Sequence, residues 1–282
     1  MAEGHAVHGM ARRVRRLIGQ PGRARGPGTQ RFDPRILDGL AVTDAEAHGK
    51  HLLVHFAGTD LSPHLHLGMH GAVSVRTHRR ALAPDGLPRT DPPDQPGLTW
   101  RHLTASLVLE VTRPTVCELL DAEGRAALHA RLGPDPLRDD ADPADAVARL
   151  RRSRRDIGAL LVDQSVVSGI GNVYRAELLW RAGIDPHTPG SSIDAETLAA
   201  LWDDACDLLA VGLGAGWIVA HPDQVAEAKR LLARGEEVPR WAKRYAVYRR
   251  RGLPCPRCGT PVVSERLGLQ TMYWCPGCQE YP

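Results

Sequence analysis

The chain has 282 residues, of which 43% are hydrophobic and 24% are charged, as in soluble globular proteins large enough for two domains. It has no run of about eighteen apolar residues, which excludes a transmembrane helix. The N-terminus lacks the apolar core of a secretory signal, so we expect a cytoplasmic protein. Residues 1–31 carry seven Arg against one acid, and residues 240–257 carry seven basic residues and no acid. Two such basic blocks favour binding to an anionic polymer. The alternative is that both are solvent-exposed surfaces with no binding partner.

The first part of the chain is predicted to be a helix followed by a β-sandwich. The helix is expected over about residues 3–18. Short alternating or apolar runs bounded by Gly- and Pro-rich turns then indicate strands. These runs lie at 52–56, 64–69, 72–76, 106–112 and 115–120. Residues 79–98 are Pro-rich and predict a loop, and the acidic segment 132–146 predicts a linker.

The second part, about residues 145–215, has the periodicity of helices. It contains the turn Gly169-Ile-Gly-Asn-Val-Tyr174, which is of the kind that opens a helix and brings backbone N–H groups close to an anion. Residues 222–250 are polar and predict irregular structure. The fold class is therefore α+β and multidomain, with domains at 1–130, 131–225 and 251–282 and a linker at 226–250.

The strongest chemical signal is a set of four cysteines near the C-terminus. Cys255-Pro-Arg-Cys258 and Cys275-Pro-Gly-Cys278 are two CxxC pairs separated by sixteen residues. Four thiolates at this spacing supply the closed tetrahedral shell that structural Zn²⁺ prefers. A disulfide framework is the alternative, but such frameworks are typical of small secreted domains.

Five motifs in chain order carry a resemblance to a known family. They are MAEGH at the N-terminus, Gly49-Lys50-His51, HLGMHG at 66–71, SGIGNVYRAELLWRAGIDP at 168–186, and the terminal C-x2-C-x16-C-x2-C. Together they resemble the formamidopyrimidine-DNA glycosylase/endonuclease VIII family of base-excision repair enzymes, on the endonuclease VIII side, over essentially the whole chain. The resemblance implies a β-sandwich, a helix–two-turn–helix domain and a zinc finger.

The resemblance also implies catalytic roles for Ala2, Glu3 and Lys50. In the family residue 2 is proline, whose free N-terminal amine attacks C1′ of the damaged nucleotide; here it is Ala2, which exposes a primary amine once Met1 is removed. Glu3 matches the glutamate that handles protons at the sugar, and Lys50 the lysine that contacts the lesion. The alternatives are an ordinary helix-start acid, a turn lysine, and an Ala2 that marks loss of catalysis.

The resemblance further implies DNA contacts. Met69 and His70 match residues inserted into the gap left by the flipped base, although a Met at such a place is otherwise a core filler. Asn172, with the Gly169 and Gly171 turn, matches the residue that holds a phosphate. The family places an arginine five residues before the third cysteine, at the tip of the finger hairpin, where this chain has Gln270.

The sequence thus predicts a DNA repair glycosylase with weak AP lyase activity and a structural Zn²⁺. Damaged double-stranded DNA is the expected partner of a monomeric protein at the bacterial nucleoid. One alternative is a catalytically impaired paralogue that binds lesion or abasic DNA. Another is a zinc ribbon that binds proteins, which leaves the first 250 residues unexplained.

Overall fold

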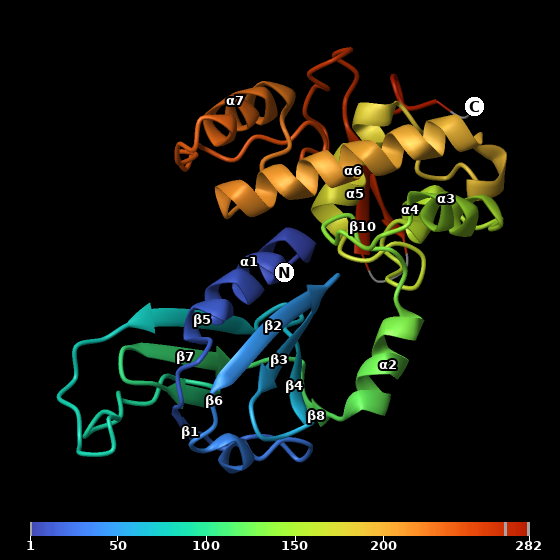
Figure 1. Ribbon diagram of the computed structural model, residues 1–282. Coiled ribbons are helices and arrows are strands. Elements are labelled where there is room, and N and C mark those ends of the chain that lie inside the picture. Colours follow the sequence, from blue (N-terminus) through green and yellow to red (C-terminus); the bar gives the residue numbers. More distant parts are fainter. Residues whose placement is uncertain (1, 268–269, 281–282) are drawn as a thin grey trace. The chain divides into compact units, whose positions relative to one another are not determined.

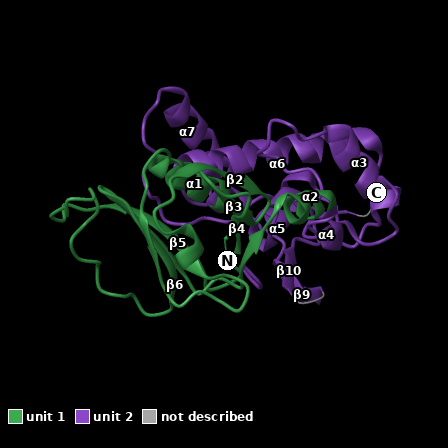
Figure 2. Cartoon of the chain, turned by 60° about the horizontal axis from the view of Figure 1, so that its bottom comes forward, with its two compact units in different colours: residues 1–2, 7–130 green, residues 3–6, 131–282 purple. Residues whose placement is uncertain are grey.

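A computed structural model describes residues 2–267 and 270–280, so the expected removal of Met1 concerns a residue outside this range. The chain divides into two compact units (Figure 2). One comprises residues 1–2 and 7–130, and the other residues 3–6 and 131–282. Helix α1 (Gly4–Val14) therefore begins in the second unit and continues in the first.

The first unit is a sandwich of two four-stranded antiparallel sheets (Figure 1). One sheet has the order β1-β6-β7-β5 and the other has the order β2-β3-β4-β8. The strands are β1 (Arg23–Arg25), β2 (Val42–His48), β3 (His51–Phe56), β4 (Ser62–His66), β5 (Ala72–Thr77), β6 (Leu98–Leu103), β7 (Leu107–Thr112) and β8 (Val116–Leu120). Leu52 from one sheet and Trp100 and Leu109 from the other are fully buried in a shared core.

Most predicted strands are confirmed, and the deviations have physical causes. The run at 64–69 is a strand only as far as His66, because Gly68, with φ +60°, starts a turn. Strand β6 was missed because it contains the buried Arg101, whose guanidinium lies 2.7 Å from Glu110 on β7. The ion pair lowers the free-energy cost of burying this guanidinium, whereas an arginine in a sequence pattern predicts an exposed position. The predicted Pro-rich loop joins β5 to β6.

The second unit holds the helices and the cysteine ribbon. Its elements are α3 (Pro143–Arg151), α4 (Ile157–Leu160), α5 (Asn172–Ala182), α6 (Ala195–Ala215), α7 (Pro222–Ala233), β9 (Val263–Leu267) and β10 (Gln270–Trp274), with a 3₁₀ turn at Gly190–Ser192. Asp194 caps α6 by accepting from the Thr197 amide, and Gly183 ends α5 in the left-handed conformation. Among the residues described, no helix is long and apolar enough to cross a membrane.

Two predictions about helical segments were wrong, and one helix was not predicted. The expected linker 132–146 ends early, because Asp142 caps α3 and Pro143 occupies its first turn. Residues 222–250 are not uniformly irregular: α7 covers the start of this stretch and buries Val225, Ala228 and Leu231, which recur every three residues. Helix α2 (Ala122–Arg131) was missed, and it buries only Leu128. Most residues in these segments are polar, so the narrow apolar stripe that each helix buries was not recognised in the sequence.

Candidate active site

The carboxylate of Glu3 lies at the N-terminal end of α5. Its Oε2 accepts from the Gly171 amide at 3.0 Å, its Oε1 accepts from the Val173 amide at 2.9 Å, and the Tyr174 amide lies 3.4 Å from Oε2. The residue is only 2% exposed. Backbone N–H groups at the positive end of a helix stabilise negative charge, so this arrangement fixes an anionic carboxylate next to residue 2.

Close backbone approach explains the glycines around Glu3. A Cβ on Gly171 would lie 2.5 Å from Cδ of Glu3, and a Cβ on Gly4 would lie 2.8 Å from Cα of Gly169. Gly169 also has φ +93°, which side chains rarely adopt. The amide of Gly171 donates to the Glu3 carboxylate, and the amide of Gly169 donates to Oε1 of Gln164, so both N–H groups already have acceptors within the protein. A phosphate contact by the two glycines stays a prediction.

Asn172 is the first residue of α5, and both ends of its amide group are engaged. Its Nδ2 donates to the carbonyl of Thr271 on β10 at 3.0 Å, and its Oδ1 accepts from Arg175. Arg175 is fully buried, and burial lowers the pKa of its guanidinium to about 10. An amide nitrogen has two hydrogens, and among the described residues only one of those of Asn172 has an acceptor. Gln270 is the first residue of β10, beside Thr271, and residues 268–269 before it lie outside the described residues.

The remaining predicted residues belong to the first unit. Ala2 is partly buried against the sandwich core. Lys50 is buried in the turn between β2 and β3, which Gly49 permits with φ +58°. Met69 is 67% exposed in the turn after β4, and His70 beside it is also exposed. A core role for Met69 is therefore wrong, whereas insertion into DNA requires this exposure.

The four ribbon cysteines form one metal site. Their Sγ atoms all lie within 4.8 Å of one another, with 3.7 Å between Cys255 and Cys278 and 3.4 Å between Cys258 and Cys275. These separations are too long for disulfide bonds and suit four thiolates around one ion. Because four protein sulfurs leave no open position, the site fits structural Zn²⁺.

Comparison with known proteins assigns each part of the chain. Residues 1–125 match the formamidopyrimidine-DNA glycosylase N-terminal domain, residues 132–221 its H2TH domain, and residues 252–280 the zinc finger found in this glycosylase and in isoleucyl-tRNA synthetase. "Endonuclease 8 1" of Mycobacterium tuberculosis is 40% identical over 283 residues, covering 99% of this chain and 100% of the relative. The chain belongs to the formamidopyrimidine-DNA glycosylase/endonuclease VIII family.

Other members of the family are similar at lower identity. A formamidopyrimidine-DNA glycosylase of Laribacter hongkongensis is 31% identical, over 98% of this chain and 95% of the relative. The crystal structure of the Lactococcus lactis glycosylase, non-covalently bound to DNA containing an AP site, superposes with a TM-score of 0.76 at 22% identity. The match covers 99% of this chain and 100% of that one. At this identity the likeness shows the family fold.

Sequence reasoning missed a histidine chain in the same sheet as Lys50. Nδ1 of His51 lies 2.9 Å from Nε2 of His64, and Nδ1 of His64 lies 3.0 Å from Glu118 on β8. Burial, followed by the charges of Lys50 and His64, lowers the pKa of His66. The alternation of His and Leu at 64–67 marked a strand, but the cross-strand partners come from distant segments.

It also missed Glu177 on α5. This carboxylate accepts from the backbone amides of Ala246, Val247 and Tyr248 at 2.8–3.0 Å. Burial raises the pKa of Glu177, although the three N–H donors oppose the rise. The side chain thereby holds the segment that leads into the ribbon against α5.

Proposed function

We propose that the protein is a DNA glycosylase of the endonuclease VIII type that excises damaged bases through a Schiff base on the α-amine of Ala2. The observation that carries the proposal is the position of the Glu3 carboxylate. Glu3 follows the nucleophilic residue directly in the chain, and backbone amides at the start of α5 hold its carboxylate in place. Family membership and the whole-length similarity to an endonuclease 8 support the same activity. Damaged double-stranded DNA is the proposed substrate, and a monomer at the bacterial nucleoid is its proposed setting.

The protonation of the amine favours Ala2 over Lys50 as nucleophile. An α-amine with a pKa of about 8 is about a tenth free base at pH 7, whereas less than about 0.1% of an ordinary lysine is. The free amine attacks C1′, the bond to the damaged base breaks, and the base leaves with a proton. The second proton of the amine passes through the Glu3 carboxylate to the ring oxygen O4′, which opens the sugar to the neutral imine.

The primary amine of Ala2 predicts weak strand cleavage. In the elimination a proton leaves C2′ and its electron pair shifts toward the imine nitrogen. The resulting enamine then expels the 3′ phosphate together with its bonding electrons and restores the C=N bond. A proline gives a permanently cationic iminium, whereas the imine of alanine must first gain a proton. Lys50 supplies a compact positive charge for the lesion's phosphate and sugar.

DNA binding is assigned to side chains of both units. Met69 and His70 fill the gap left by the flipped nucleotide and offset part of the lost stacking. Asn172 donates its remaining amide hydrogen to a phosphate oxygen. Gln270 replaces a cationic contact by a neutral one, which removes about 1.5–3 kcal/mol of charge-assisted bonding. The basic block at 240–257 supplies non-specific phosphate binding.

The zinc site supports this function indirectly. Its four thiolates hold a metal that, when bound, supplies folding energy and no reaction chemistry. Cys255, Cys258, Cys275 and Cys278 thereby fix the ribbon that carries β9 and β10.

Glu3→Gln tests the catalytic assignment. Single-turnover excision of an oxidised base should slow by about 10²–10⁴-fold, as expected when a positioned acid–base group is lost. Duplex affinity should stay nearly unchanged. Glu196→Gln, the same chemical change at an exposed position in the first turn of α6, is the matched control. Equal excision by the two variants would reject the role of Glu3, and no excision by the wild type from any lesion would favour the binding-only paralogue.

A further inference from the structure

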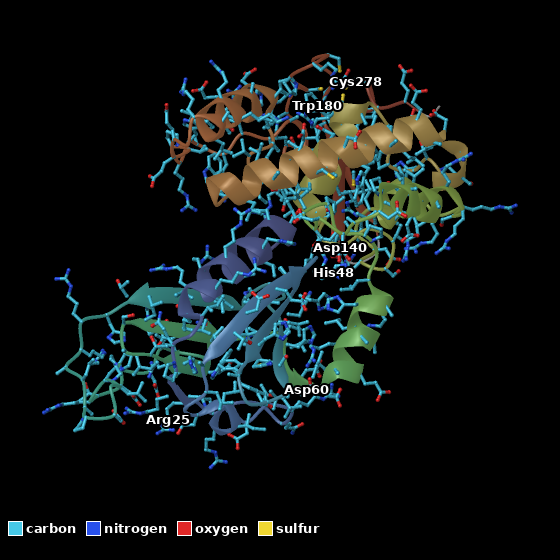
Figure 3. The ribbon with its side chains drawn as sticks, viewed as in Figure 1. Arg25, His48, Asp60, Asp140, Trp180 and Cys278 are labelled. Atoms are coloured by element: carbon cyan, nitrogen blue, oxygen red, sulfur yellow. The ribbon has the colours of Figure 1, made fainter. Side chains whose placement is uncertain are left out.

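One tryptophan joins α5 to the zinc ribbon. Trp180 lies in the last turn of α5 and is 4% exposed. Its indole Nε1 donates a hydrogen bond to Sγ of Cys255 at 3.3 Å. The same sulfur accepts from the Arg257 amide at 3.4 Å. Figure 3 marks Trp180 and Cys278, another of the ribbon ligands, in this unit.

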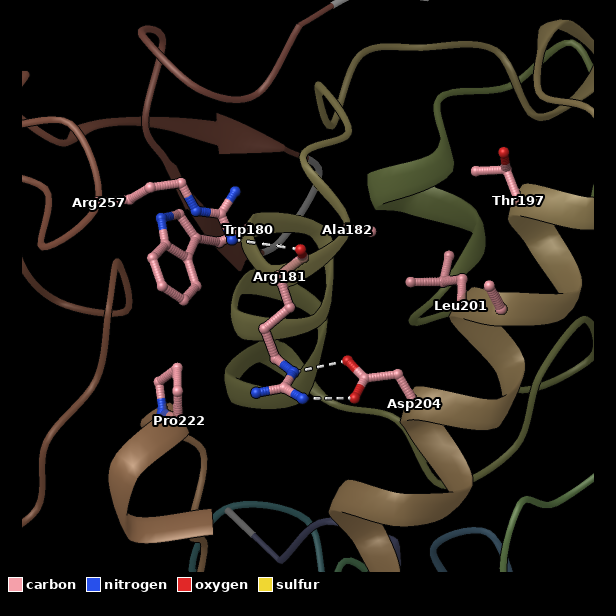
Figure 4. Close-up of a pocket in the computed structure, with 9 residues that line it drawn as sticks. Trp180, Arg181, Ala182, Thr197, Leu201, Asp204, Pro222 and Arg257 are labelled. Atoms are coloured by element: carbon pink, nitrogen blue, oxygen red, sulfur yellow. Dashed lines mark hydrogen bonds and ion pairs between the residues drawn. The ribbon is translucent and has the colours of Figure 1, made fainter. Parts of the chain in front are cut away.

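The face of the same indole is covered from the ribbon. The Arg257 guanidinium carbon lies 4.4 Å from the Trp180 ring centroid, and Nη2 of Arg257 donates to the Arg181 carbonyl at 3.3 Å (Figure 4). Arg257 belongs to the first CxxC pair, between Cys255 and Cys258. The indole therefore makes two separable contacts: a stacking contact, which a phenylalanine ring can also make, and a hydrogen bond from its N–H, which phenylalanine lacks.

The opposite end of α5 is fastened to the ribbon as well. Asn172 donates to Thr271 on β10, and Glu177 in the middle of the helix binds residues 246–248. Eleven residues make this helix about 16 Å long. A short rigid element thus connects a metal ligand at one end with Asn172 at the other.

We propose that Trp180 is a positioning residue of the zinc site, whose N–H orients and stabilises the Cys255 thiolate and so couples zinc occupancy to the placement of Asn172. A donor aimed at a thiolate stabilises its negative charge and restricts the directions in which the sulfur can bind a metal. The zinc part of this inference stands on the four cysteines, and only the part concerning DNA rests on the proposed function.

Trp180→Phe separates the two contacts of the indole, because phenylalanine keeps a ring beneath Arg257 and lacks the N–H. Trp217→Phe is the matched control. Trp217 is 7% exposed in the same core, and within the described part of the chain its Nε1 has no hydrogen-bond partner. Both substitutions remove the same atoms from a buried tryptophan, but only one removes a donor from a metal ligand.

The measurement is zinc affinity of the full-length protein by competition with a chromogenic chelator. Loss of an outer hydrogen bond to a ligand typically weakens metal binding by about 10–100-fold, so we expect this loss in Trp180→Phe and little change in Trp217→Phe. The cobalt-substituted Trp180→Phe protein should also show a shifted sulfur-to-metal charge-transfer band. Equal zinc affinities and unshifted spectra in both variants would overturn the proposal.

A second measurement needs no substitution. In the wild-type protein loaded with ¹¹³Cd and labelled with ¹⁵N-tryptophan, one indole N–H resonance should show scalar coupling to the metal. The absence of any coupled indole resonance would overturn the hydrogen bond even if Trp180→Phe fails to fold.

DNA binding tests the coupling to Asn172. The probe is an abasic-site duplex. To reach half of its maximal affinity for this DNA, Trp180→Phe should need about 10–100-fold more free zinc than the wild type, because its zinc affinity is lower by that factor. Affinity should recover at saturating zinc. If zinc binding weakens but DNA affinity does not follow zinc occupancy, the coupling is wrong. If instead the protein is not a glycosylase, the zinc measurements would still give the expected results, so the two failures can be distinguished.

Discussion

Gly171→Ala tests the steric basis of the Glu3 site. The backbone of Gly171, with φ −122° and ψ −162°, is open to alanine, so the substitution adds no conformational strain. The new Cβ would meet Cδ of Glu3 at 2.5 Å, about 0.9 Å short of the 3.4 Å at which ordinary contact begins. The three atoms nearest to it all belong to the Glu3 side chain.

The cost follows from the hydrogen bonds that Glu3 makes. Moving the carboxylate by about 0.9 Å stretches the bonds from Gly171 and Val173, now 3.0 and 2.9 Å, beyond hydrogen-bond range. Each buried N–H left without an acceptor costs about 1–3 kcal/mol, and reduced entropy of the unfolded chain returns about 0.4–1 kcal/mol. We expect a net loss of about 1–6 kcal/mol, which lowers the Tm by about 2–20 °C.

Thermal denaturation of a double-mutant cycle measures this cost. Glu3→Ala removes the atoms that the new Cβ would meet, so adding Gly171→Ala in that background should be nearly neutral. The reasoning would be refuted if Gly171→Ala cost the same in both backgrounds, or cost nothing in the presence of Glu3.

Three further predictions concern metal, DNA and pH. Zinc chelation or Cys255→Ser should lower both the Tm and DNA affinity, because metal-binding energy is folding energy in such modules; unchanged values would reject a structural site. Asn172→Ala should weaken binding to abasic-site DNA at every salt concentration with little change in salt slope, because it removes no charge; a markedly altered slope would contradict this. Burial lowers the pKa of His187, but its hydrogen bonds to Glu265 and Asp185 outweigh burial and raise it. Its contribution to stability is therefore complete below the unfolded pKa of about 6.5 and is lost as pH rises through the folded value. Urea denaturation from about pH 6 to 9 should show this loss, and His187→Gln should remove it; an identical pH profile in the variant would refute it.

Local spacing explains which parts of the molecule could be predicted. The zinc ligands come in pairs two residues apart, so the sequence already places each pair around one ion. The turn before Asn172 is likewise encoded locally, by Gly169 and Gly171, two residues apart. The family resemblance named Glu3 but gave no reason for its position, because its amide partners lie about 170 residues further along the chain.

Contacts between distant segments account for what was missed. Trp180 and Cys255 are 75 residues apart, and His64 and Glu118 are 54 apart. Tryptophan in an apolar helix predicts core packing, and nothing local indicates a sulfur acceptor. Arg101 was missed for the same reason, since its burial depends on Glu110 in the adjacent strand.

The central claim is that the α-amine of residue 2 is the nucleophile. Borohydride reduction of the protein with abasic-site DNA, followed by mass mapping of the cross-linked peptide, tests it most directly. We predict an adduct on Ala2 in a protein that lacks Met1, and stronger strand cleavage by Ala2→Pro, because a secondary amine forms the cationic iminium without an extra proton. Trapping at Lys50 would contradict the assignment of the nucleophile, and a protein that keeps Met1 and forms no adduct would contradict the Schiff-base mechanism.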